Sequence, residues 1–95
     1  MKINVKYFDS LKKITGKSEE VIEMDDYATM EQLLQKLKEK YGDLFSDLVM
    51  DSKGNIKEDI LLFLNGRSIK AHKEIYGEFL TDEAIAVIFS VKGGG

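Results

Sequence analysis

The feature that most constrains the fold is an amphipathic helix that the sequence predicts over residues 29–41. Thr29 and Gln32 have the spacing of a capping box, in which the threonine hydroxyl accepts a hydrogen bond from an otherwise unpaired backbone N–H. Apolar side chains recur at helical spacing and form one stripe, made by Met30, Leu33, Leu34, Leu37 and Tyr41. Gly42 is the expected end of the helix. A helix with a single apolar stripe needs a second layer to cover it, and we expect a β-sheet.

Strand patterns on both sides of this helix supply the sheet. Residues 2–8 and 20–24 alternate apolar and polar side chains, which predicts two strands that each bury one face. Between them, apolar residues at three-residue spacing indicate a short helical turn that ends at Gly16. Residues 60–64 and 84–89 are almost wholly apolar, so we expect both to be central strands and the first to be buried on both faces.

The order of these elements predicts the fold class. Asn65 and Gly66 are a strong signal for a two-residue hairpin, and residues 68–79 are irregular, as in a long surface connection. We predict an α+β fold of the β-grasp (ubiquitin-like) type, with a mixed sheet, one main helix packed across it, and the first and last strands adjacent. We assign residues 1–91 to this domain and residues 92–95 to a flexible C-terminal glycine tail.

Composition argues against several classes of protein. Cysteine is absent, which excludes disulfides and thiolate metal sites and fits a cytoplasmic protein. Basic residues number 14 against 17 acidic residues and are interspersed with them, so we do not expect a nucleic-acid partner. The longest apolar runs are far shorter than the roughly 18 residues of a membrane span, and we expect no membrane association.

Side chains that could carry catalysis are sparse. His72 is the only histidine, and it has no carboxylate cluster at ligand spacing, so we expect a surface residue. The serines lack the Gly-x-Ser-x-Gly frame of a nucleophile elbow. Residues 51–55 predict a turn and not a calcium loop, because Gly54 falls too early and Lys53 occupies a ligand position. We therefore predict no catalytic residue and no metal site.

The three terminal glycines are the remaining candidate for function. Glycine has no Cβ, so Gly93, Gly94 and Gly95 could pass through a channel too narrow for side chains. A carboxylate is a poor electrophile until it becomes an acyl-adenylate or a thioester. Once activated, the carboxylate of Gly95 could accept sulfur as a thiocarboxylate or be attacked by an amine. The alternative is an inert terminus with no function of its own.

Short matches through nearly the whole length carry a family resemblance. The matching positions are, in chain order, residues 5–8, 11, 15–17, 28–30, 33–34, 65–67, 80 and 82, 88–89 and 94–95. In this order the chain resembles the MoaD family, the small subunits of molybdopterin synthase, together with the related archaeal ubiquitin-like modifier proteins.

The resemblance implies a carrier that is not itself a catalyst and binds no cofactor. An adenylating enzyme of the ubiquitin-activating type would use ATP to form the acyl-adenylate of Gly95, and a sulfur donor would convert it to a thiocarboxylate. Gly93 and Gly94 would thread into the partner. The large subunit of molybdopterin synthase would then take the sulfur into the molybdenum or tungsten cofactor. We expect Phe89 and Val91, beside the tail, to help dock these partners.

Two other functions stay open. As a protein modifier, the chain would form an isopeptide bond between Gly95 and a target lysine. As a plain interaction domain, it would carry an inert tail. A thiazole carrier of the ThiS type is disfavoured, because those chains are typically shorter and lack the hairpin segment.

Overall fold

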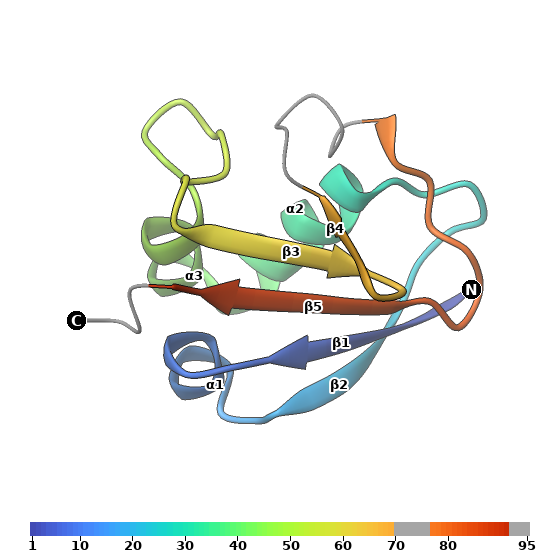
Figure 1. Cartoon of the computed structure of the whole chain (residues 1–95), viewed down its shortest axis with the longest axis horizontal. Coiled ribbons are helices and arrows are strands. Elements are labelled where there is room, and N and C mark those ends of the chain that lie inside the picture. Colours follow the sequence, from blue (N-terminus) through green and yellow to red (C-terminus); the bar gives the residue numbers. More distant parts are fainter. Residues whose placement is uncertain (70–76, 92–95) are drawn as a thin grey trace.

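The computed structural model of the protein describes residues 1–69 and 77–91. It has two layers, a five-stranded sheet and a helical layer that covers one face of it. In Figure 1 the sheet faces the viewer, and helices α2 and α3 lie behind it. The other face of the sheet carries no helix in the described part of the chain, and we refer to it as the open face.

The last strand lies at the centre of the sheet. The strands are β1 (Lys2–Tyr7), β2 (Glu19–Glu23), β3 (Ile60–Leu64), β4 (Arg67–Ile69) and β5 (Ile85–Ser90), in the order β2-β1-β5-β3-β4. β5 pairs parallel with β1 and antiparallel with β3, and the two outer pairs are antiparallel. The predicted mixed sheet, with the first and last strands adjacent, is confirmed.

Helix α2 (Met30–Tyr41) is the predicted main helix, and its capping box is present. The Gln32 N–H donates to Thr29 Oγ1 at 3.3 Å, and the Thr29 N–H donates to Gln32 Oε1 at 2.8 Å. The stripe faces the sheet: Met30, Leu33, Leu34 and Leu37 are buried and Tyr41 is half-buried. The short helix α1 (Ser10–Thr15) ends at Gly16, which takes the left-handed conformation as predicted.

A third helix, α3 (Asp43–Val49), was not predicted. It begins directly after Gly42, whose positive φ of 74° ends α2 and redirects the chain. Phe45 and Val49 are spaced by four residues, lie on one helical face and are fully buried. This spacing was the available signal, but a two-residue pattern over seven residues is too short to identify a helix from periodicity.

The prediction that residues 60–64 are buried on both faces is wrong. Ile60, Leu62 and Leu64 are buried against the helices, whereas Leu61 and Phe63 are only half-buried. The reason is that the sheet has a single helical layer, so the side chains on its open face remain partly in contact with solvent.

The segment after β3 is more regular than expected. Asn65 and Gly66 both have positive φ, at 52° and 83°, as a type I′ hairpin turn requires, so the predicted hairpin is confirmed. Its second strand, β4, occupies the beginning of the range predicted to be irregular, residues 68–79. Residues 70–76, including His72, lie outside the described residues.

Candidate functional site

The exit of the central strand β5 is where the predicted tail begins. β5 ends at Ser90, and the Val91 N–H donates a hydrogen bond to the carbonyl of Asp59 at 2.9 Å. This bond anchors the last described residue to the segment that leads into β3. The predicted site residues Gly93, Gly94 and Gly95 lie outside the described residues.

The predicted interface residues differ in exposure. Val91 is 55% exposed, as expected for a docking residue, and Phe89 is half-buried on the open face. The ring of Phe89 meets that of Phe8 edge to face, with centroids 6.1 Å apart and planes at 66°. Phe8 itself is 46% exposed, although it directly follows β1. The structure therefore adds Phe8 to the surface that Phe89 was expected to form.

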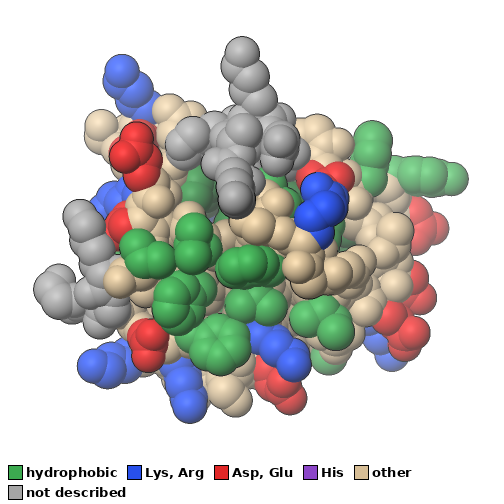
Figure 2. Space-filling model, in the orientation of Figure 1, with side chains coloured by type: hydrophobic (Ala, Val, Ile, Leu, Met, Phe, Trp, Pro, Cys, Tyr) green, Lys and Arg blue, Asp and Glu red, His purple; other side chains and the backbone are tan. Residues whose placement is uncertain are grey.

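Strand register extends this apolar surface along the open face. Leu61 lies opposite Phe89 and Phe63 lies opposite Val87 across the β3–β5 pair, and all four side chains are half-buried. We define the open-face patch as Phe8, Leu61, Phe63, Val87 and Phe89. Figure 2 shows hydrophobic side chains gathered over the sheet, toward the end where the chain leaves β5. An apolar surface of this kind beside a chain exit is typical of a docking site.

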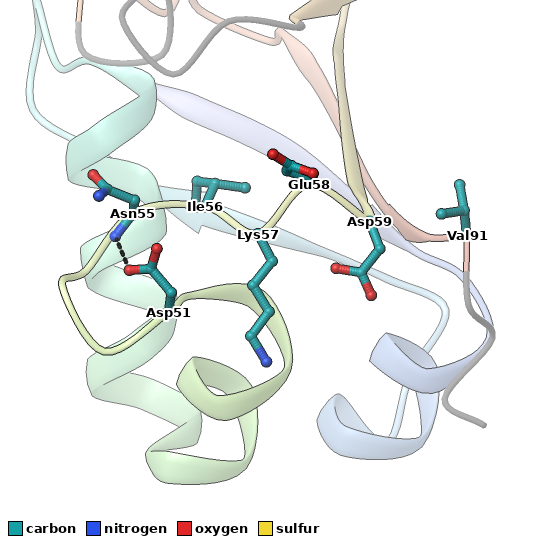
Figure 3. Close-up of a pocket in the computed structure, with 7 residues that line it drawn as sticks. All are labelled: Asp51, Asn55, Ile56, Lys57, Glu58, Asp59 and Val91. Atoms are coloured by element: carbon teal, nitrogen blue, oxygen red, sulfur yellow. Dashed lines mark hydrogen bonds between the residues drawn. The ribbon is translucent and has the colours of Figure 1, made fainter.

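An open groove of about 810 Å³ borders the same exit (Figure 3). Its lining consists of Asp51, Asn55, Ile56, Lys57, Glu58, Asp59 and Val91. The Asp51 carboxylate accepts hydrogen bonds from the backbone of Lys53 and Asn55, which forms the predicted turn. With three carboxylates and one ammonium the groove is acidic, so it repels a carboxylate rather than holding one.

The strongest electrostatic cluster lies on the helical side of the sheet and is structural. The side chain of Glu20 is 8% exposed and accepts hydrogen bonds from Lys40 Nζ at 2.5 Å, from Tyr7 Oη at 2.5 Å and from Tyr41 Oη. Burial raises the pKa of the Glu20 carboxyl, but these hydrogen bonds outweigh burial and lower the pKa to about 2. Burial and the bond to Glu20 also raise the pKa of Tyr7. The cluster holds the last turn of α2 against β1 and β2.

The described part of the chain contains neither a candidate metal site nor a membrane-spanning helix. Among residues 1–69 and 77–91, no group of three or more His, Asp or Glu side chains could hold a metal ion. No helix of this part of the chain is long and apolar enough to cross a membrane. What the structure assembles is an apolar surface, formed by the open-face patch and Val91 at the exit of β5.

Sequence reasoning found part of this surface and missed the rest. Phe89 and Val91 were expected because they adjoin the tail, but Phe8 and Leu61 were not. The alternation of Phe63 and Leu61 within β3 places both on one face. However, no local pattern indicates that this face of β3 aligns with Phe89, because the register between two distant strands is not encoded within either strand.

Comparison with known proteins supports the family resemblance seen in the sequence. The profile of the ThiS family matches residues 5–95. Small archaeal modifier protein 3 of Haloferax volcanii is 27% identical over 95 residues, covering 99% of this chain and 100% of that protein.

Two solved structures show the same fold. SAMP1 from Haloferax volcanii superposes with a TM-score of 0.82 at 20% identity, covering 95% of this chain and 94% of the other. A putative molybdopterin converting factor, subunit 1, from Pyrococcus furiosus superposes with a TM-score of 0.76 at 26% identity, covering 95% and 97%. These neighbours are ubiquitin-like β-grasp proteins, so the predicted fold class is confirmed.

Proposed function

The chain belongs to the ThiS family, and on that premise we propose that it is a sulfur carrier that works through the carboxylate of Gly95. The family comprises small ubiquitin-like carriers and modifiers, which are not catalysts themselves. The observation that supports this role most directly is where the chain leaves the sheet. The chain leaves the central strand at Val91, directly beside the open-face patch. A partner that docks on this patch therefore lies next to the tail.

The length of the tail sets how deep the partner's active site can be. Residues 92–95 span at most about 13–14 Å when fully extended, at 3.3–3.6 Å per residue. This reach is sufficient for the carboxylate to enter a partner while the β-grasp domain remains outside. Gly93 and Gly94 are proposed to occupy the narrow part of the channel, where a Cβ would clash.

The proposed activation takes place on the partner, an adenylating enzyme of the ubiquitin-activating type that uses ATP. A carboxylate oxygen of Gly95 attacks the α-phosphorus of ATP, pyrophosphate leaves, and an acyl-adenylate forms. A nucleophilic sulfur donor then attacks the acyl carbon and AMP leaves, so that the carboxylate becomes a thiocarboxylate. The chain contributes its terminal carboxylate and its docking surface, and it needs no bound cofactor of its own.

We propose molybdopterin as the destination of the sulfur. The support is the relative from Pyrococcus furiosus, described as a putative molybdopterin converting factor subunit, which is 26% identical over nearly the whole chain. The acceptor partner would then be the large subunit of molybdopterin synthase. The family name also keeps a thiazole carrier among the alternatives, although the presence of the β3–β4 hairpin disfavours it.

A second candidate function is protein modification. The support is the 27% identity to small archaeal modifier protein 3, which extends over the full length of both chains. In this reaction the amine of a target lysine attacks the acyl carbon of activated Gly95, AMP leaves, and an isopeptide bond forms. Activation is common to both functions, so only the nucleophile distinguishes them.

The deciding experiment is intact-mass measurement after incubation with an adenylating enzyme, ATP and a sulfide source. Exchange of one oxygen for sulfur supports the carrier function, and covalent conjugates of higher mass support the modifier function. The control is the variant that lacks Gly95. An unchanged mass, with an adenylating enzyme that activates another carrier in parallel, would leave only the plain interaction domain.

A further inference from the structure

A second aromatic surface lies at the opposite end of β5 from the tail. Tyr27 is 84% exposed and Phe79 is 63% exposed, although both side chains are large and apolar. Two backbone hydrogen bonds of 2.9 Å join their segments, from Leu80 N–H to the Ala28 carbonyl and from Met30 N–H to the Glu78 carbonyl. We refer to Tyr27, Phe79 and the residues that flank them, 25–31 and 78–83, as the distal surface.

Backbone pairing brings together the two segments that carry these aromatic side chains. Phe79 pairs antiparallel with Thr29, and the neighbouring residues Ala28 and Leu80 are buried. Successive side chains of an extended segment point to opposite sides, so Phe79 points outward, away from the buried Leu80. Tyr27 lies in the turn that leads into this pair, two residues before Thr29, and its side chain is exposed as well. The two exposed aromatic side chains therefore lie on segments that pair with each other.

The backbone conformation of Tyr27 indicates that its side chain has a role in binding. Tyr27 has a φ of 66°, in the left-handed region that glycine occupies without strain. Burial does not compensate for the strain, because the side chain is 84% exposed. The hydrogen-bonded turn from Asp25 to Ala28 requires a positive φ at its third residue, but it does not require an aromatic side chain there. A strained aromatic residue at a position that glycine would fill without strain is typical of residues kept for binding.

The charge of the distal surface specifies what kind of partner fits it. Every charged side chain in residues 25–31 and 78–83 is acidic: Asp25, Asp26, Glu31, Glu78, Asp82 and Glu83. Figure 2 shows hydrophobic side chains projecting at the upper right edge, with acidic side chains below them. This one-sided charge contrasts with the whole chain, where 14 basic residues face 17 acidic ones.

Nearby cations neutralise only part of this charge. Arg67 forms an ion pair with Glu78, and the Met1 ammonium lies 3.9 Å from the Asp26 carboxylate, whose side chain is still 84% exposed. The ammonium of Lys36 donates to the backbone carbonyl of Glu23 at 2.5 Å, so this bond does not neutralise a carboxylate of the distal surface. Asp25, Asp82 and Glu83 have no ion-pair partner among the described residues.

We propose that the distal surface docks a basic segment of another protein, with arginine or lysine side chains over the rings of Tyr27 and Phe79. A guanidinium on an exposed aromatic face gains a cation–π attraction, and the surrounding carboxylates strengthen it. The same carboxylates repel nucleic-acid phosphates and anionic lipid headgroups.

This docking is independent of the proposed carrier chemistry. β5 runs from the distal surface to the tail exit, and its six residues span about 20 Å. A basic partner could therefore bind at one end while the tail enters an enzyme at the other. The two proposals can fail separately, because the test of this one involves neither Gly95 nor an adenylating enzyme.

The test is an NMR titration of the isotope-labelled full chain with a hexapeptide of alternating arginine and leucine. We expect shifts concentrated in the amides of residues 25–31 and 78–83, and an affinity that falls as salt is raised. Tyr27→Gly and Phe79→Ser should each weaken binding about tenfold or more. Leu44→Ser is the matched control, because Leu44 is 70% exposed on α3, outside the distal surface, and this change should leave binding unaltered.

A second measurement separates binding from folding. Tyr27→Gly removes a strained residue, so its denaturation midpoint should stay the same or rise while the peptide affinity falls. A lower midpoint would overturn the strain argument. The proposal would be overturned if both aromatic variants bound the peptide as tightly as the unchanged chain, or if the shifts were centred elsewhere. Binding of a glutamate–leucine peptide as tight as that of the arginine–leucine peptide would also overturn it. Concentration-dependent shifts of the distal surface without peptide would identify a second copy as the occupant and also overturn it.

Discussion

Deletion of Gly95 tests the proposed carrier function most sharply, because the deleted chain still ends on two glycines. The deletion shortens the tether by about 3.3–3.6 Å. In an enzyme active site, a misplacement of only about 1 Å can cost on the order of 100-fold in rate. We therefore expect the ATP–pyrophosphate exchange catalysed by the cognate adenylating enzyme to fall by at least about 100-fold.

The structure indicates that the fold cannot compensate for the lost length. β5 would have to slide by one residue relative to β1 and β3, with which it pairs on both sides. Because side chains alternate between the two faces, such a slip would turn Ile88 toward solvent and Phe89 into the helical layer. It would also break the hydrogen bond from Val91 to Asp59. The tail therefore starts from a fixed point.

The controls are a chain extended by a fourth glycine and a thermal denaturation of all three proteins. The extended chain should also fail in the exchange assay, since its carboxylate is displaced by the same distance in the other direction. Denaturation midpoints should agree, because the terminal residues of a domain generally contribute little to its stability. Full exchange by both the shortened and the extended chains would refute Gly95 as the unique site of activation.

Three further predictions follow from the fold and the docking surface. Leu37→Ala should lower the free energy of unfolding by about 2–5 kcal/mol, because Leu37 is fully buried on the face of α2 that packs against the sheet; an unchanged denaturant midpoint would contradict this packing. Val91→Asp should weaken binding to the adenylating enzyme, whereas Val21→Asp, on the far edge strand β2 and equally exposed, should not; equal affinities in a binding titration would remove Val91 from the interface. The folded-state pKa of Glu20 lies near 2, below its ordinary value of 4.5, so its stabilising effect is complete above about pH 4.5 and lost as the pH falls toward 2. Glu20→Gln should therefore be less stable at neutral pH and less sensitive to acid in this range, and identical pH profiles in urea denaturation would argue against the cluster.

Several elements could be predicted from the sequence because their causes are local. The capping box of Thr29 and Gln32 and the apolar stripe of α2 depend only on residues within a few turns of one helix. The hairpin at Asn65 and Gly66 depends on two residues that tolerate positive φ. Position in the sheet was also partly predictable, since an almost wholly apolar strand such as β5 favours the centre.

The rest was decided only by tertiary structure, because it depends on contacts between segments far apart in the chain. Phe8 meets Phe89, and Ala28 pairs with Leu80, only once β5 lies beside β1 and the segment before it returns to α2. The apolar composition of β3 and β5 did not reveal that a single helical layer would leave one of their faces open. Local periodicity records which side chains share a face, but the covering of that face depends on how the whole chain packs. Both surfaces described above arise from this packing, one at each end of the central strand.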